Sequence, residues 1–291
     1  MRIHAALLSA CLLWAVSFIA TKTALQVVPP LTIVSIRLVI AALCFVPLLY
    51  RRRSAVFTGG WGRLRKLFVL SLFGTGLHYG SQTIGIGHTT ACNASLWPIT
   101  CPIFIMFISA LFLGERISAK KALGTIIAVA GVVAVMGSDV LLGVDLRSHL
   151  LGDGLVFLSI FLWALFTVYG KELNAELGAL EMLGAATVIG AIWMLPIGFW
   201  EMRHTGFVLS AITPQAWGSI LFLGVGCGFG ASLLYFLGLE KTESQKVGVY
   251  LYTIPPMTYI AAALFLGEKI GPNLLAGSAL VAAGVFLTER G

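Results

Sequence analysis

Polar side chains near residue 80 are candidates for binding a solute through hydrogen bonds. His78 and Gln82 are four residues apart, so a helix places them on one face with Gly74, and Tyr79 lies beside them. The surrounding residues are apolar, and polar groups in such a stretch usually face a protein interior. The pair could bind a solute, or it could hydrogen-bond to neighbouring backbone and serve packing. The sequence leaves both roles open.

Aromatic residues form two related pairs. Trp14 and Trp163 share the sequence Leu-Trp-Ala, and Trp97 and Tyr250 each precede a proline by five residues. Aromatic walls with a few polar groups suit a small amphipathic solute, although the same rings could serve packing alone. The predicted solute-binding residues are therefore Trp14, Ser17, His78, Tyr79, Gln82, Trp97, Trp163 and Tyr250.

Prolines interrupt two of the apolar stretches. A proline frees a backbone carbonyl and kinks a helix, so it could form a hinge or expose a ligand-binding carbonyl, and a static kink is the alternative. The predicted gating or hinge residues are Pro98, Pro102, Pro255 and Pro256.

Arg37 lies within an apolar stretch. It is about six residues from the start of that stretch, or roughly 9 Å at 1.5 Å per residue. If this stretch crosses a membrane, the Arg37 side chain could reach the membrane surface on the outer side, or it could attract the carboxylate of a solute. We favour a structural role for it.

Motifs of common enzymes do not occur in the sequence. It has no H-E-x-x-H, Walker loop, G-x-S-x-G or paired carboxylates within an apolar stretch. The five cysteines form no C-x-x-C pair, so a metal or redox site is not expected. We therefore predict no catalytic activity, no metal and no cofactor.

Membrane helices are the elements that must position these residues. The chain is 58% hydrophobic and 11% charged, whereas soluble domains carry about 25% charged residues. Helices satisfy their own backbone hydrogen bonds in lipid, and about 20 apolar residues cross the bilayer core. We predict an all-α integral membrane protein with ten helices, at approximately 5–25, 31–50, 67–87, 91–113, 119–137, 152–170, 180–200, 215–238, 246–266 and 273–288.

The basic residues of the connections predict the orientation. Fourteen Lys and Arg fall on the side of the N-terminus and four on the other side, and the richer side is cytoplasmic. Both termini are thus predicted to be cytoplasmic, in a plasma membrane of the bacterial inner-membrane type. This bias also explains the net charge of +7 without a nucleic-acid partner.

An internal repeat divides the chain. The sequence LFLGE occurs at 111–115 and again at 264–268, and further pairs follow in the same order along both halves. We predict a first repeat at 1–138, an outside linker at 139–151 and a second repeat at 152–291. Each half has five helices, an odd number, so the second must be inverted relative to the first, as in many secondary transporters.

The repeated sequences resemble a known family. The stretches ACNASLWPITCPIFIMFISALFLGERIS and VGVYLYTIPPMTYIAAALFLGEKI are similar to the EamA repeat of the drug/metabolite transporter superfamily, as are LLWAVSFIATK and Arg37. The resemblance covers essentially the whole chain and is closest to YddG-type amino acid exporters. It implies ten helices in a 5+5 arrangement.

These observations together predict a secondary transporter that exports small amphipathic metabolites by alternating access, and the resemblance implies that these are most specifically amino acids, including aromatic ones. The alternatives are a drug or other metabolite exporter of the same fold, and a channel-like or structural membrane protein. No carboxylate falls at mid-membrane depth, which favours export down a gradient or coupling through His78. We expect a central cavity lined by predicted helices 1, 3, 4, 6, 8 and 9.

The predicted helices at 119–137 and 273–288 carry small residues at regular spacing. Stripes of small residues allow close helix contact. We expect these two helices to brace the fold or to join two protomers in a homodimer. The expected partners are a small-molecule substrate and the lipid bilayer.

Overall fold

A computed structural model describes residues 2–50, 60–89, 94, 97–142, 150–266 and 272–291 of the chain, and every regular element in these ranges is helical. Arg51, Arg52, Arg53, Arg147 and Lys269, which contributed to the predicted orientation, lie outside the described residues. Five described helices are long and apolar enough to cross a membrane: Ile3–Leu25, Pro30–Tyr50, Leu150–Leu177, Ala179–Thr205 and Pro214–Leu239.

The first half of the chain folds into helices that follow the predicted stretches, with two irregular segments. Its elements are α1 (Arg2–Leu25), α2 (Pro30–Tyr50), α4 (Gly60–Ser71), the π-helical η1 (Leu72–Gly76), α5 (Leu77–His88), the 3₁₀-helical η2 (Trp97–Thr100), α7 (Cys101–Leu113) and α8 (Ala119–Leu142).

The second half has a similar succession of elements, with the short η3 and α13 in addition among the described residues. They are α9 (Leu150–Leu177), α10 (Ala179–Thr205), the short η3 (Leu209–Ala211), α11 (Pro214–Leu221), the π-helical η4 (Phe222–Ala231), α12 (Ser232–Leu239), α13 (Ser244–Gly248), the 3₁₀-helical η5 (Val249–Thr253), α14 (Ile254–Leu266) and α15 (Pro272–Glu289).

The irregular segments recur at positions that the sequence repeat relates. One π-helix contains Gly74 and the other contains its counterpart Gly224, while one 3₁₀ segment begins at Trp97 and the other contains Tyr250. The π-helix is rare and often lies at functional sites, whereas 3₁₀ turns are common at helix termini. Their paired occurrence supports the sequence repeat independently of residue identity.

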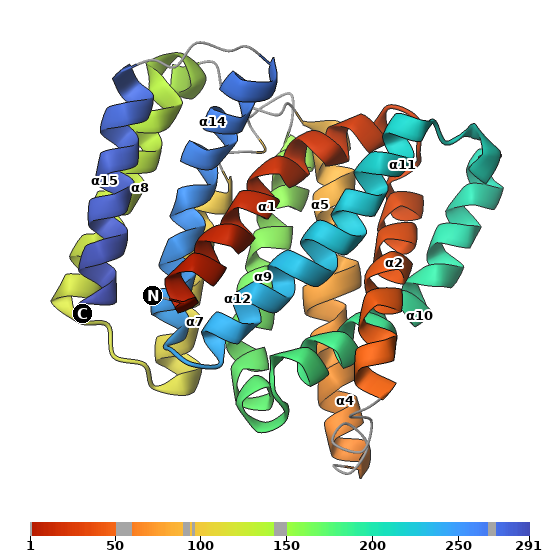
Figure 1. Cartoon of the computed structure of the whole chain (residues 1–291), viewed down its shortest axis with the longest axis horizontal. Coiled ribbons are helices and arrows are strands. Elements are labelled where there is room, and N and C mark those ends of the chain that lie inside the picture. Colours follow the sequence, from red (N-terminus) through yellow and green to blue (C-terminus); the bar gives the residue numbers. More distant parts are fainter. Residues whose placement is uncertain (1, 51–59, 90–93, 95–96, 143–149, 267–271) are drawn as a thin grey trace.

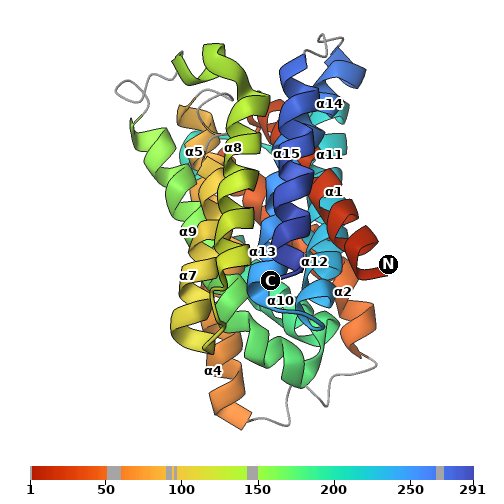
Figure 2. The ribbon, with the colours of Figure 1, turned by 90° about the vertical axis from the view of Figure 1, so that its left-hand side faces the viewer.

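Small residues hold α8 and α15 together. The two helices run side by side at one edge of the bundle (Figures 1 and 2). A Cβ added to Gly131 would lie 2.8 Å from the carbonyl oxygen of Gly277, and one added to Gly284 would lie 2.5 Å from that of Gly124. The small-residue stripes therefore face each other within one chain and brace the fold.

A buried carboxylate fixes the start of α2. Glu201 of α10 accepts hydrogen bonds from the backbone amides of Leu31 and Thr32 and from the Thr32 hydroxyl. The first amides of a helix have no partner within it, and its dipole attracts negative charge there. This contact sets the position of α2 and so places Arg37, further along the same helix.

Glu115 joins three elements at one end of the bundle. It follows α7, where Gly114 adopts a left-handed conformation (φ 67°), and it accepts hydrogen bonds from Lys171 of α9 and from the amides of Ser244 and Gln245. Burial raises the pKa of the Glu115 carboxyl, but the bonds from Lys171, Ser244 and Gln245 outweigh burial and leave this pKa below its usual range.

Candidate functional site

A partly open cavity lies between the helices of the bundle, with about 580 Å³ of atom-free space that includes its open side. Its walls come from α1, α2, α5, η2, α7, α9, η5 and α14. The lining residues are Trp14, Ser17, Phe18, Arg37, His78, Tyr79, Gln82, Pro98, Cys101, Ile160, Trp163, Leu251 and Ile254. We call this space the central cavity.

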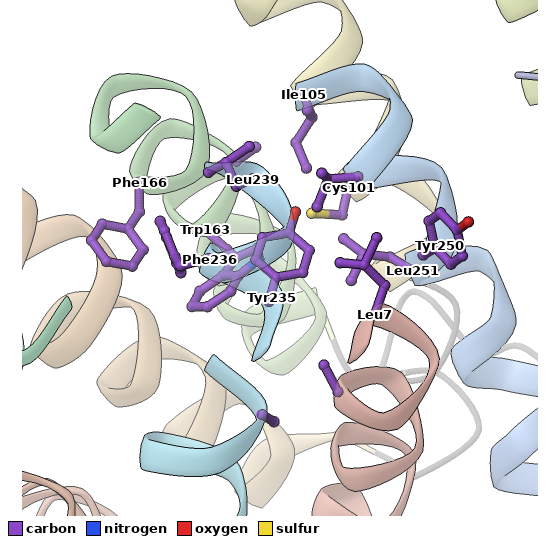
Figure 3. Close-up of a cluster of buried hydrophobic side chains, with 14 of the residues drawn as sticks. Leu7, Cys101, Ile105, Trp163, Phe166, Tyr235, Phe236, Leu239, Tyr250 and Leu251 are labelled. Atoms are coloured by element: carbon purple, nitrogen blue, oxygen red, sulfur yellow. The ribbon is translucent and has the colours of Figure 1, made fainter. Parts of the chain in front are cut away.

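Trp163 forms the aromatic wall of the central cavity together with Trp14. The two rings meet edge to face, with centroids 5.2 Å apart and planes at 84°, which is a favoured geometry for aromatic pairs. Phe166 of the same helix and Tyr235 and Phe236 of α12 pack around Trp163 with centroid distances of 5.6, 5.8 and 6.2 Å (Figure 3). This layer holds the indole in a fixed orientation.

His78 faces the same wall from α5. Its Nδ1 lies 2.8 Å from the Ser159 carbonyl oxygen of α9. Because a carbonyl only accepts, Nδ1 carries the proton of this bond, and Nε2 is left for another partner. The His78 ring lies 5.1 Å from Trp163 and 4.7 Å from Tyr79. The histidine thus bonds to backbone and also lines the cavity, and its role in binding a solute stays a prediction.

Close packing of α5 on α9 makes this arrangement possible. A Cβ added to Gly85 would lie 2.8 Å from the Gly152 carbonyl oxygen, and one added to Gly152 would lie 2.6 Å from backbone of His88. Only glycine at both positions lets the two backbones approach so closely, since any side chain would separate them.

Arg37 reaches the central cavity from α2. Its side chain is 3% exposed, and its guanidinium carbon lies 3.9 Å from the centroid of the Tyr79 ring, a cation–π distance. One terminal nitrogen donates to the Leu223 carbonyl at 3.3 Å, and Nε has no described hydrogen-bond partner. The sequence favoured a structural role for this arginine, and the structure places it, buried, on the cavity wall.

A second, partly open cavity adjoins the first, with about 990 Å³ of atom-free space that includes its open side. Phe18, Pro98 and Ile254 line both cavities. The second cavity continues along the end of α1, where Lys22 and Thr23 of the helix and Gln26 just after it form part of the lining. It includes the predicted hinge residue Pro255. We call this space the outer cavity, after its position at the end of α1 predicted to face outside.

Four predicted site residues do not line either cavity. Tyr250 packs elsewhere: its hydroxyl bonds to His4, and Figure 3 shows it well apart from Trp163. Trp97 packs its ring on Phe157 with centroids 5.3 Å apart. Pro102 and Pro256 are also absent from the lining. Both prolines are buried within their helices.

The predicted set of cavity helices also differs from the structure in one member. Predicted helix 8 corresponds to α11, η4 and α12, and its expected place in the lining is wrong. Tyr235 and Phe236 of α12 pack behind Trp163 and do not lie on the cavity wall. The α2 helix takes its place through Arg37. The sequence held no signal for the buried position of Arg37, because this position depends on how η4 and α5 pack against α2.

The described residues contain no group of three or more His, Cys, Asp or Glu side chains that could hold a metal ion. None of the residues lining the two cavities is an Asp or a Glu. The chemistry available is therefore hydrogen bonding by His78, Gln82 and Ser17, attraction of negative charge by Arg37 and Lys22, and contact with aromatic rings.

Comparisons with known proteins agree on one kind of protein. The EamA-like transporter family matches residues 1–137 and 150–290, in two copies. An uncharacterized transporter of Archaeoglobus fulgidus is 30% identical over 277 residues, which cover 95% of each chain. The uncharacterized transporter YvbV of Bacillus subtilis is 29% identical, covering 96% of this chain and 88% of that one.

Two further similarities bear on substrate and fold. A protein of Streptantibioticus cattleyicolor named "Probable terminal-alkyne amino-acid exporter" is 30% identical over 268 residues, covering 89% of this chain and 82% of its own. A crystal structure with 18% sequence identity superposes with a TM-score of 0.79 over 98% of this chain and 95% of the other, which shows a shared fold.

Proposed function

The chain belongs to the EamA-like transporter family, and from this premise we propose that it exports small amphipathic metabolites, most specifically amino acids including aromatic ones, by alternating access. Membership makes it a multi-pass membrane transporter and not an enzyme. The observation that carries the finer proposal is the central cavity, which combines an aromatic wall with hydrogen-bonding groups and a cation. The amino-acid exporter among its relatives supports the same substrate class.

We propose that the helical segments form a 5+5 inverted repeat. The paired π-helices and the paired 3₁₀ segments support this arrangement because they occur at related positions in both halves. Two inverted units can exchange conformations, so one site can face each side of the membrane in turn. The first unit, the linker and the second unit are assigned to 1–138, 139–151 and 152–291.

Contacts at one end of the bundle support alternating access. Glu115 binds Lys171 and the start of α13, and Lys121 forms an ion pair with Glu243 nearby. The outer cavity lies at the opposite end, near the last turn of α1. We propose that the Glu115 contacts close the cytoplasmic end in this conformation, while the residues shared by the two cavities, Phe18, Pro98 and Ile254, separate the central site from the outside.

The solute-binding role is proposed for Trp14, Ser17, His78, Tyr79, Gln82 and Trp163. The aromatic rings would contact an apolar side chain, and the polar groups would bind the charged backbone atoms of an amino acid. For Trp97, Tyr250, Pro102 and Pro256, which lie off the lining, we propose a supporting role in the two 3₁₀ segments and the helices that follow them.

A flux assay on the full chain in liposomes tests this function. The initial rate of labelled phenylalanine uptake is measured at increasing concentration, with protein-free liposomes as the control. A carrier gives a rate that saturates, whereas a channel gives a rate that rises linearly. A rate equal to that of the protein-free liposomes for every amino acid would contradict the proposal.

A further inference from the structure

Arg37 is a cation buried at membrane depth. Its side chain is 3% exposed and reaches the central cavity, so neither bulk water nor lipid headgroups solvate it. Isolated charges are costly in such places and are normally paired. The location therefore demands a source of negative charge or of hydrogen-bond acceptors.

The groups around Arg37 meet this demand only in part. The Tyr79 ring of α5 offers a cation–π contact, and the Leu223 carbonyl of η4 accepts one hydrogen bond at 3.3 Å. His78 and Cys227 are the titratable neighbours that also face it, and neither provides a carboxylate. A guanidinium has five N–H donors, and Nε is buried without a described partner.

No described carboxylate forms an ion pair with Arg37. Three acidic side chains of the described residues bind other partners. Glu201 binds the start of α2, Asp153 accepts from Thr89, and Glu115 binds Lys171. Arg37 therefore lines the central cavity without a described carboxylate partner, and these three acids bind other groups.

Packing keeps the guanidinium at this position. A Cβ added to Gly224 would lie 3.0 Å from the Arg37 carbonyl oxygen and 2.7 Å from Ile40, so glycine lets η4 approach α2 closely. The Leu223 carbonyl that binds Arg37 precedes this glycine. The arginine is therefore held between η4 and the Tyr79 ring.

We propose that Arg37 binds the carboxylate of the transported solute, so that the protein selects carboxylic acids and amino acids over amines that lack this group. The inference rests on the proposed function and names the chemistry of its substrate. Arginine and carboxylate form charge-assisted, often bidentate hydrogen bonds. The carboxylate of the solute supplies the negative charge that no described side chain provides to Arg37. The side chain of the solute extends toward Trp14 and Trp163.

Competition for phenylalanine transport tests the proposal on the unaltered protein. Proteoliposomes take up labelled phenylalanine in the presence of unlabelled 3-phenylpropionate, which keeps the carboxylate, or phenethylamine, which keeps only the amine. We expect 3-phenylpropionate to compete and phenethylamine to compete at least ~10-fold less well, because a hydrogen bond to a charged group contributes about 1.5–3 kcal/mol. Equal competition by the two compounds overturns the proposal.

Variants connect this selectivity to Arg37. Arg37→Gln should weaken phenylalanine binding by about 10- to 100-fold and erase the preference for 3-phenylpropionate over phenethylamine. Arg37→Lys keeps the charge but loses the planar guanidinium that can bind a carboxylate with two hydrogen bonds. This variant should retain a weaker preference for 3-phenylpropionate over phenethylamine. Arg203→Gln removes the same charge from an exposed position at the end of α10 and should change neither value. An Arg37→Gln protein that keeps the preference overturns the proposal.

The outcomes separate this inference from the proposed function. Phenylalanine transport with no preference between acid and amine contradicts the role of Arg37 and leaves the exporter proposal intact. Absence of transport and of competition for all three compounds contradicts both. Because the competition assay uses the parent protein, a variant that fails to fold does not prevent a decision.

Discussion

The indole rings of Trp14 and Trp163 lie edge to face with centroids 5.2 Å apart, although half the chain separates them in sequence. One comes from the first helix of each half, so the pair joins the two repeats at the wall of the central cavity. An inverted repeat brings equivalent helices together around a shared axis. The contact between these two residues is thus where the repeat and the proposed solute site coincide.

Removal of the Trp163 ring should weaken transport. We expect Trp163→Ala to reduce phenylalanine uptake by about tenfold, since an aromatic contact contributes ~0.5–1.5 kcal/mol beyond the area that it buries. Trp200→Ala is the matched control, because Trp200 is exposed on α10 and stacks only on His204 among described rings. Equal loss of uptake in both variants would show that the cavity wall has no special role.

Transport should proceed without an imposed proton gradient. Neither cavity is lined by a carboxylate, and a proton-coupled transporter usually keeps one as its relay. In proteoliposomes with equal pH on both sides, phenylalanine should equilibrate at a rate that an added pH gradient does not change. Accumulation that follows the gradient and disappears in His78→Ala would instead assign coupling to His78.

Ionisation of Glu115 should make the stability of the folded protein depend on pH in the acid range. Its pKa in the folded protein lies below the ordinary value of 4.5, so the charge stabilises the fold above that value, and the contribution is lost as the pH falls through the folded pKa. We expect Glu115→Gln to lower the free energy of unfolding by about 1–3 kcal/mol at neutral pH. Its thermal unfolding temperature in detergent should then vary less than that of the parent between neutral and acid pH.

The control for Glu115 is Glu172→Gln. Glu172 is an exposed acid near the same end of α9, so its loss should leave the pH dependence unchanged. Identical pH profiles for the parent and Glu115→Gln would contradict the stabilising role of Glu115.

The α8–α15 contact should tolerate no side chain at Gly131. A Cβ there would lie 2.6 Å from the Val281 amide nitrogen, so Gly131→Ala must push the helices apart, and such overpacking costs about 1–3 kcal/mol. Gly218→Ala adds the same methyl group to α11, where nothing lies within 4 Å. In detergent, Gly131→Ala should unfold at a lower temperature than Gly218→Ala. Equal unfolding temperatures would contradict the proposal that the α8–α15 contact stabilises the fold.

The predicted orientation has its own test. In a variant without the five native cysteines, Gly62→Cys at the start of α4 should resist an impermeant thiol reagent added to intact cells, because its end of the bundle is predicted to be cytoplasmic. Ala211→Cys, exposed in η3 at the opposite end, should react. Gly62 has free space around its Cβ position, so the substitution itself causes no clash. The reverse labelling pattern would invert the topology.

Much of the central cavity could be predicted from the sequence, because polar side chains in an apolar helix usually face the protein interior. His78, Gln82 and Trp14 were found from spacing and from the repeat, and all three line the cavity. The family was also correctly identified from the repeated stretches. The substrate role of these residues stays a prediction.

Other features depend on packing that a single sequence does not reveal. Depth along a helix did not show whether Arg37 faces lipid headgroups or the interior; the approach of η4 and α5 decides that. The repeat related Trp97 to Tyr250, but both lie in 3₁₀ segments, whose tighter winding changes the direction of successive side chains. Pro98 lines the cavity, whereas its neighbour Trp97 does not.

Counterflow tests the alternating-access proposal most directly. Proteoliposomes loaded with unlabelled phenylalanine are diluted into a trace of labelled phenylalanine, and the label inside is followed over time. An alternating carrier exchanges internal for external solute through one site. We therefore predict that the label inside rises transiently above its equilibrium level, and only in preloaded proteoliposomes. A channel or a structural protein gives a monotonic approach to equilibrium or no uptake, and either of these results would contradict the account.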